Sequence, residues 1–291
     1  LAEDHGLRLA VLVNDFGDVN IDVQLLNSAG DDGIIDLPNG CVCCTLARDL
    51  IGVVKSLLAV ERRPEHIVLE ASGVSSPAEI VSILDVPELS TRIRINSIIT
   101  LVDSENILKL ARATMFAAKQ ISSADLLLVN KIDLVEEDHL AAVLAWIAEV
   151  APDAHIIRTQ YAQVPLDLIL DNGRTGPAQT ASFGQIAAGI DADGHAFESW
   201  TFRAEQPLSG ERLLAVMNGL PASIYRAKGI VYMAGDPGRR YVLHLTGKRV
   251  TLIADRRWAE IEPGTQLVFI GAAGALDTVD LNAKLSDCTA A

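Results

Sequence analysis

The sequence lacks the segments that would place the chain in a membrane or direct it to secretion. No apolar run among its 291 residues approaches the roughly 20 needed to cross a bilayer. No signal-peptide pattern is visible either. Apolar residues make up 49% of the chain, but they are spread over short segments. We therefore expect a soluble, cytoplasmic protein with no membrane partner.

Cysteine is scarce, and three of the four cysteines lie together. Cys41, Cys43 and Cys44 fall just before a predicted helix, whereas Cys288 lies near the C-terminus. This is no disulfide framework, and thiolates at a helix N-terminus suit Zn²⁺, Co²⁺ or Cu(I). Three cysteines leave a fourth tetrahedral position for Asp15, a water or a partner's ligand, which suits metal transfer. A structural zinc site and inert buried thiols are the competing interpretations.

Basic residues are too few in the first two thirds of the chain to attract nucleic acid. Residues 1–196 carry 28 acidic and 13 basic side chains, whereas residues 197–291 carry 10 and 11, so the net charge of −14 resides in the first part. Such an acidic surface repels phosphate backbones, and we expect no nucleic-acid partner. The basic pairs of the second part, such as Arg239 and Arg240, have the spacing of solvated hairpin turns.

What the sequence does contain is a regular alternation of aliphatic strands and helical segments. This alternation is typical of an α/β fold with a parallel sheet and helices on both faces. The predicted strands cover residues 8–14, 66–70, 95–103, 125–130 and 155–158, and the predicted helices cover residues 45–60, 104–124 in two pieces, and 136–150.

The length of the chain exceeds the usual size of a single core, and composition marks a boundary. Residues 172–195 are rich in Gly, Asp, Pro, Thr and Ala with little periodicity, which indicates a flexible connector. We predict a first domain over residues 1–171 and a smaller α+β domain, with a mostly antiparallel sheet, over residues 196–291.

The most informative motif is Asn130-Lys131-Ile132-Asp133, directly after an aliphatic strand. Open α/β sheets bind ligands at the carboxyl ends of their strands. The Asp133 carboxylate can accept hydrogen bonds from the N1–H and N2–H₂ edge of guanine, the Asn130 amide can reach O6 or N7, and the Lys131 stem can cover the ring. The motif predicts a guanine-nucleotide site, although these four residues also arise by chance.

Three acidic residues and a glycine are candidates for the phosphate side of that site. Glu70 ends an aliphatic strand and could touch magnesium-bound water or the γ-phosphate, and Gly73 lets the backbone come close. Asp15 and Asp22 follow the first strand, where they suit magnesium coordination, water positioning or switching. A helix cap after Glu70 and a plain turn after the first strand are the competing interpretations.

Four motifs, in this order and spacing, resemble those of the CobW family of GTPase metallochaperones: Asn14-Asp15-Phe16-Gly17, Gly40-Cys41-Val42-Cys43-Cys44, Glu70-Ala71-Ser72-Gly73 and the Asn130 tetrapeptide. The resemblance continues at Tyr225-Arg226-Ala227-Lys228-Gly229 and in a last helix ending at Cys288. It implies a P-loop NTPase-type sheet and a CobW C-terminal domain. It also implies that GTP binding and hydrolysis, with Mg²⁺, control metal loading and delivery to a client protein.

The resemblance implies a role for each candidate residue. The clustered cysteines would bind the metal, Zn²⁺ by default and Co²⁺ second, and the tetrapeptide would read guanine. Glu70, Asp15 and Asp22 would act on the magnesium and switch side. Position 15 is more usually Glu in the family, which weakens the assignment of Asp15. The client would bind through the C-terminal domain, and the oligomeric state stays open.

One element of that family is lacking, the glycine-rich loop ending in Gly-Lys-Ser/Thr that cradles phosphates. A strand, that loop and most of a helix, on the order of 30–40 residues, would precede Leu1. Without them the sheet lacks a central strand and phosphate binding loses most of its electrostatic support. We expect GTPase activity of a longer natural protein and little or none of residues 1–291 alone.

Two other functions are left open by the sequence. A non-hydrolysing metal-binding or storage module would hold zinc at the cysteines beside a vestigial nucleotide site, and its zinc affinity would be indifferent to GTP analogues. A kinase-like phosphotransferase is disfavoured, because the tetrapeptide selects guanine and no acceptor pocket is recognisable.

Overall fold

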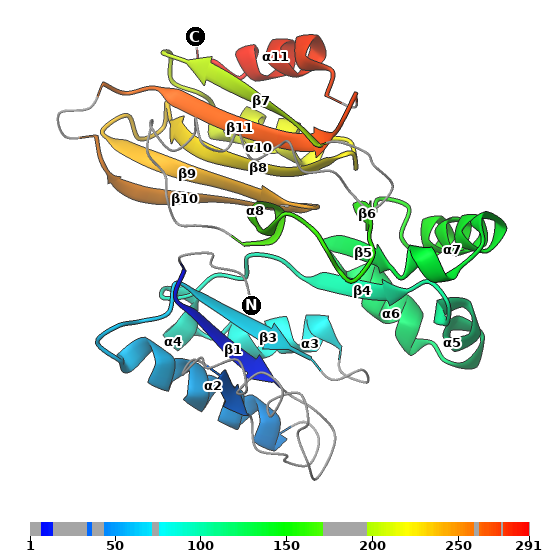
Figure 1. Cartoon of the computed structure of the whole chain (residues 1–291). Helices are drawn as coiled ribbons and strands as arrows, with labels where there is room; N and C mark the ends of the chain where they lie inside the picture. Colours follow the sequence, from blue (N-terminus) through cyan, green and yellow to red (C-terminus); the bar gives the residue numbers. More distant parts are fainter. Residues whose placement is uncertain are drawn as a thin grey trace. The chain divides into compact units, whose positions relative to one another are not determined.

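The computed structural model describes residues 7–13, 34–36, 44–71, 76–170, 197–258, 262–274 and 276–290. The chain divides into two compact units (Figure 1). The first comprises residues 1–95 with 170–173, and the second comprises residues 96–169 with 174–291. No helix in the described part of the chain is both long and apolar enough to cross a membrane.

The first unit is built on a three-stranded parallel sheet in the order β2-β1-β3. Its elements are β1 Leu9–Val13, β2 Ile34–Asp36, α2 Cys44–Ala59, β3 His66–Glu70, α3 Pro77–Leu84 and α4 Pro87–Ser90. The aliphatic strand β1 lies in the centre, and Leu12 packs with Leu50 of α2 and Ile80 of α3 in one buried core.

The three strands of the first unit end together. Val13, the last residue of β1, lies in register with Asp36 on one side and with Glu70 on the other. Because the strands are parallel, Asp36 and Glu70 both close the carboxyl edge of this sheet. That edge is where open α/β sheets bind ligands.

The second unit begins with another three-stranded parallel sheet, in the order β4-β5-β6. Its elements are β4 Ile99–Asp103, α5 Ile107–Ala113, α6 Phe116–Ser123, β5 Leu126–Asn130, the 3₁₀ turn η1 Ile132–Leu134, α7 Glu137–Val150, β6 Ile156–Arg158 and α8 Leu166–Ile169. Strand β5 is buried on both faces. Leu127 and Val129 face the core formed with α6 and α7, and Leu126 and Leu128 face the opposite side.

The rest of the second unit is an antiparallel sheet in the order β10-β9-β8-β11-β7 (Figure 1). Its elements are β7 Phe197–Ala204, α10 Gly210–Asn218, β8 Ile224–Tyr232, β9 Arg239–Thr246, β10 Arg249–Arg257, β11 Thr265–Ala272 and α11 Thr278–Ser286. Leu213 of α10 and Leu281 of α11 pack on one face of this sheet against Leu267 and Phe269 of β11.

The opposite face of the antiparallel sheet covers the sheet that contains β5. Phe197 of β7 and Val268 and Ile270 of β11 form a single buried cluster with Leu126 and Leu128. Helices α5 to α7 cover one side of β4, β5 and β6, and α8 with the antiparallel sheet covers the other. This is why β5 reads as an uninterrupted aliphatic run.

The structure confirms the predicted α/β class with a second α+β part. One strand is shorter than predicted. The strand predicted over residues 95–103 begins only at Ile99, because Ile95 packs against the core of the first unit. The elements β2, α3, α4, η1 and α8 were not predicted. Residues 171–196 lie outside the described residues, so the connector and the domain boundaries stay predictions.

Candidate nucleotide-binding site

The predicted guanine-reading tetrapeptide begins with the last residue of β5 and continues into η1. Ile132 is buried in the core beneath the sheet, which anchors the turn. Lys131 has a φ of 61° and a ψ of 32°, in the left-handed region. A long side chain rarely adopts that conformation, and such residues gather at functional sites.

Asn130 ties together the ends of three neighbouring strands. It lies in register with Asp103, the last residue of β4. Its carbonyl oxygen accepts hydrogen bonds from the hydroxyl of Ser104 at 2.6 Å and from the Ser104 N–H at 3.1 Å. Its side-chain Oδ1 accepts from the N–H of Ala162, beyond β6, at 2.9 Å. Because Oδ1 accepts this hydrogen bond, the NH₂ group of the same amide points away from Ala162. The NH₂ group has no hydrogen-bond partner among the described residues.

Asp133 follows on the exposed side of η1. Among the residues that the structure describes, none donates a hydrogen bond to its carboxylate. The two carboxylate oxygens therefore keep their capacity to accept from a ligand that presents two adjacent N–H donors.

The loop after β6 belongs to the same edge and was not predicted as part of the site. Thr159 is buried, and its hydroxyl donates to the carbonyl of Gln163 at 2.7 Å. Tyr161 and Ala162 have φ values of 52° and 53°, and Tyr161 is 82% exposed. Two consecutive non-glycine residues in the left-handed region mark a backbone held by its surroundings. The available signal was its position directly after the strand that neighbours β5.

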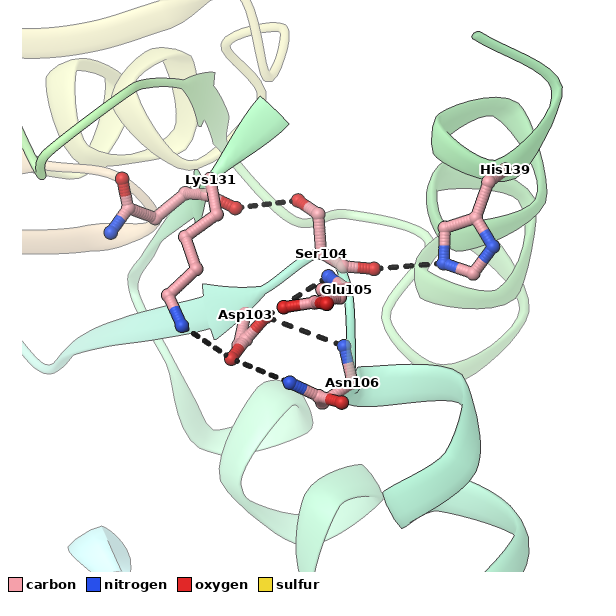
Figure 2. Close-up of polar contacts among 7 residues, drawn as sticks. Asp103, Ser104, Glu105, Asn106, Lys131 and His139 are labelled. Carbon is pink, nitrogen blue, oxygen red and sulfur yellow. Dashed lines mark hydrogen bonds and ion pairs between the residues drawn. The ribbon is translucent and has the colours of Figure 1, made fainter. Parts of the chain in front are cut away.

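A second unpredicted group, at the end of β4, holds Lys131 (Figure 2). The ammonium of Lys131 lies 2.8 Å from Oδ2 of Asp103. The other oxygen, Oδ1, accepts from the backbone N–H of Glu105 at 3.0 Å and of Asn106 at 3.3 Å. On the far side of this turn, Nε2 of His139 lies 2.9 Å from the carbonyl oxygen of Ser104, which links α7 to the same edge.

The charges of Asp103 and Lys131 stabilise each other. Burial alone would raise the pKa of the Asp103 carboxyl, but hydrogen bonds from Lys131, Asn106 and the Glu105 backbone outweigh it and hold that pKa below its usual value. The hydrogen bond to Asp103, followed by the charge of that carboxylate, raises the pKa of Lys131. Both groups are therefore ionised at neutral pH.

The other predicted residues fall in the first unit. Glu70 ends β3 at the carboxyl edge and is exposed. Cys44 begins α2, but its side chain is not described. Asp15, Asp22, Cys41, Cys43 and Gly73 lie outside the described residues, so their roles stay predictions. Within the described ranges, no group of three His, Cys, Asp or Glu side chains is placed to hold a metal ion.

Cys288, by contrast, is fully packed into the second unit. Its side chain is buried, and Sγ donates to the carbonyl of Lys284 at 3.2 Å. Burial raises the pKa of this thiol. A protonated, buried thiol is a poor metal ligand, and Cys288 therefore acts as a small core residue.

Two family models match the chain. The family described as "CobW/HypB/UreG, nucleotide-binding domain" matches residues 1–158, and "Cobalamin synthesis protein cobW C-terminal domain" matches residues 197–289. Among similar proteins, the zinc chaperone CobW of Sinorhizobium sp. is 27% identical, with 91% of this chain and 85% of that protein aligned. The zinc-regulated GTPase metalloprotein activator 1 of Dictyostelium discoideum is 25% identical over 90% of this chain and 65% of its own length.

One solved structure, the Zn(II)-bound YjiA GTPase from E. coli, aligns with a TM-score of 0.45 at 19% identity, over 99% of this chain and 92% of that one. The family models together extend over both units of the chain, and the first alone matches more than half of the residues. The chain therefore belongs to the CobW/HypB/UreG nucleotide-binding family and carries the CobW C-terminal domain.

Proposed function

We propose that this chain is the nucleotide switch and metal carrier of a GTP-dependent metallochaperone. In this proposal GTP binds with its base at Asn130, Lys131 and Asp133. Its hydrolysis changes how tightly the cysteines at positions 41, 43 and 44 hold a transition metal, zinc first and cobalt second. The metal is cargo, and it is delivered to a client metalloprotein.

The observation that carries the proposal is the way the tetrapeptide presents its polar groups. The engaged Oδ1 of Asn130 orients the amide NH₂, which can donate to the N7 or O6 acceptors of guanine. The exposed Asp133 carboxylate can accept from N1–H and N2–H₂. Adenine presents an acceptor at N1 and no amine at C2, so it would leave that carboxylate unpaired, which costs binding free energy.

The phosphate and magnesium side of the site is proposed from the first unit. Glu70 and the backbone of Asp36 lie at the carboxyl edge of β1, β2 and β3. Carboxylate oxygens are the ligands that Mg²⁺ prefers, and bound Mg²⁺ neutralises phosphate charge. We assign Glu70, Asp15 and Asp22 to this side, and Gly73 to close backbone approach to the phosphates.

The names of the two relatives, a zinc chaperone and a zinc-regulated GTPase metalloprotein activator, support GTP as the nucleotide and zinc as the cargo. The CobW C-terminal domain over residues 197–289 is the part that we propose contacts the client. Its antiparallel sheet lies on the face of β5 opposite the helices.

The test is base selectivity in the protein expressed from its natural start codon. The unchanged protein should bind GDP more tightly than ADP or xanthosine diphosphate, as measured by calorimetry. Asp133→Asn should lose about 10²–10⁴-fold in GDP affinity, because two hydrogen bonds to a charged acceptor are weakened, and should gain affinity for xanthosine diphosphate.

The matched control is Asp138→Asn, which removes the same charge from the exposed first turn of α7. It should change GDP affinity less than about twofold. Equal binding of GDP and ADP by the unchanged protein, or an Asp133→Asn variant with unaltered base preference, would overturn the guanine assignment.

A further inference from the structure

Asp103 belongs to none of the motifs that identify the nucleotide site, yet it holds one member of the tetrapeptide. It ends β4 in register with Asn130, so the two strands present a carboxylate and an amide side by side. The Lys131 ammonium reaches back across the edge to this carboxylate at 2.8 Å. No local sequence pattern indicates this pair, because the two residues are 28 positions apart.

The Asp103 carboxylate is oriented by hydrogen bonds that do not involve Lys131. Its Oδ1 accepts from the N–H groups of Glu105 and Asn106, and its Oδ2 accepts from the side-chain amide of Asn106 at 3.1 Å (Figure 2). These bonds form a tight turn between β4 and α5. A carboxylate with this many donors has one orientation, and the Lys131 ammonium is therefore drawn to one place.

Lys131 is also fixed at its other end. Its backbone has a left-handed conformation between buried Ile132 and the anchored Asn130. A lysine stem has four rotatable bonds and loses much freedom when it is ordered. With the backbone held and the ammonium paired, part of that freedom is already lost before a ligand binds, in a side chain that is 43% exposed. Preorganisation of this kind raises affinity by removing a cost of binding.

We propose that Asp103 is a positioning residue for the nucleotide base, which holds Lys131 so that the methylene stem forms a ready surface for the flat face of guanine. This inference rests on the proposed guanine site. It assigns the Lys131 ammonium to a structural ion pair within the protein, and its stem to contact with the ring. Asp133 reads the edge of the base, and Asp103 acts only through Lys131.

The proposed roles of Asp103 and Asp133 depend on different parts of the base. The ring face is shared by guanine and hypoxanthine, whereas hypoxanthine lacks the N2 amine that the Asp133 carboxylate would accept from. Loss of Asp103 should therefore lower the affinities for GDP and for inosine diphosphate by the same factor. Loss of Asp133 should change the ratio of the two affinities. A merely structural role of Asp103 predicts no link to Lys131.

The experiment is a double-mutant cycle on GDP and inosine diphosphate binding, in the protein expressed from its natural start codon. Asp103→Asn keeps the size of the side chain and an oxygen that accepts from the turn, and Lys131→Met keeps an apolar stem without the ammonium. Asp103→Asn should lower both affinities about 3- to 10-fold, because Lys131 must then be ordered by the ligand. In the Lys131→Met background it should have less than a twofold effect.

Asp138→Asn is again the matched control, since it removes one negative charge from an exposed side chain in the first turn of α7, outside the turn that holds Asp103. It should leave GDP affinity within about twofold. If Asp103→Asn does not fold, Lys131→Met alone decides, and an unchanged GDP affinity in that variant overturns the proposal.

The outcomes separate this proposal from the one on which it rests. An unchanged protein that binds no GDP overturns the guanine site and the role of Asp103 together. GDP binding that is insensitive to Asp103→Asn, or equally sensitive with and without Lys131, overturns the role of Asp103 alone. A shift in the ratio of GDP to inosine diphosphate affinity would make Asp103 a reader of the base edge, and that also contradicts the proposal.

Discussion

Asp125 and Arg249 form an ion pair, with 2.6 Å between Oδ2 and Nε, that joins the residue before β5 to the first residue of β10. Asp125 is 3% exposed, and the same oxygen accepts from the N–H of Ile98 at 2.8 Å. Beside it, the ammonium of Lys248 donates to the carbonyl of Ser122 at 3.0 Å. The β9–β10 hairpin is thus fastened to one end of the strand whose other end is Asn130.

Arg249→Met should destabilise the protein, because it leaves the buried Asp125 carboxylate without its countercharge. We expect a loss of about 2–3 kcal/mol in the free energy of unfolding, near the lower end for a broken buried pair, since the Arg249 side chain is 27% exposed. Urea denaturation measures it. Arg239→Met is the control, because its pair with Asp236 is exposed and should contribute less than about 1 kcal/mol. Equal losses in the two variants would contradict the account.

Gly247→Ala should weaken the same attachment through sterics and backbone strain. Gly247 has a φ of +53°, and a Cβ there would lie 1.7 Å from the carbonyl oxygen of Asp125. The backbone must shift, and we expect a loss of about 2–4 kcal/mol in the free energy of unfolding. Gly238→Ala, where a Cβ meets nothing within 4 Å, should change it by less than about 1 kcal/mol. A Gly247→Ala protein as stable as the Gly238→Ala protein would refute this packing.

His155 should make stability fall in mild acid. It is buried directly before β6, and burial lowers its pKa, an effect that the backbone groups of Ile224 and Ala222 only partly oppose. Below the unfolded pKa of about 6.5 the unfolded chain binds a proton that the folded chain does not. Stability is therefore lost as the pH falls from about 6.5 toward the lower folded pKa, by at most about 1.4 kcal/mol per pH unit.

The measurement is the free energy of unfolding at pH 7.5 and pH 5.5, for the unchanged protein and for His155→Gln. The variant should show a smaller drop between the two values, since glutamine does not titrate. Acidic groups contribute equally to both proteins, so the difference between the drops reports His155. An identical drop would mean that the folded protein accepts the proton at His155 without penalty.

The clustered cysteines should account for zinc binding, and the buried one should not. Replacement of Cys41, Cys43 or Cys44 by Ser should each weaken zinc binding on the order of 100-fold, because each removes one of a few strong ligands. Cys288→Ala should leave zinc affinity unchanged, since its thiol is packed against the Lys284 carbonyl. Competition with a chromophoric chelator measures both. Zinc affinity that depends on Cys288 instead would contradict the assignment.

Local sequence patterns were sufficient to predict β5 and to locate the tetrapeptide at its end. They were insufficient to predict the contacts that hold these residues in place. An aliphatic run buried on both faces is visible in the sequence, and so is the polar motif at its end. The Asp103 to Lys131 pair and the contact of Asn130 with Ala162 form across strands, and no local pattern encodes them. They follow only from the pairing of β4, β5 and β6.

The elements that were missed have physical reasons as well. Strand β2 has three residues, too few for a periodic signal. Helix α3 has eight residues, although Pro77 at its start and Glu79 in its first turn are a helix-start signal that could have been used. The late start of β4 reflects Ile95, whose packing against the core of the first unit is a tertiary effect.

Nucleotide binding and metal binding are coupled in the proposed function, and the zinc dissociation constant in different nucleotide states measures that coupling. The protein expressed from its natural start codon would be titrated with zinc in the presence of GDP and of a non-hydrolysable GTP analogue. We expect zinc affinities that differ by at least about fivefold between the two states, the lower range of a coupling between two sites. Equal zinc affinities, with both nucleotides demonstrably bound, would contradict it and favour a metal-storage module.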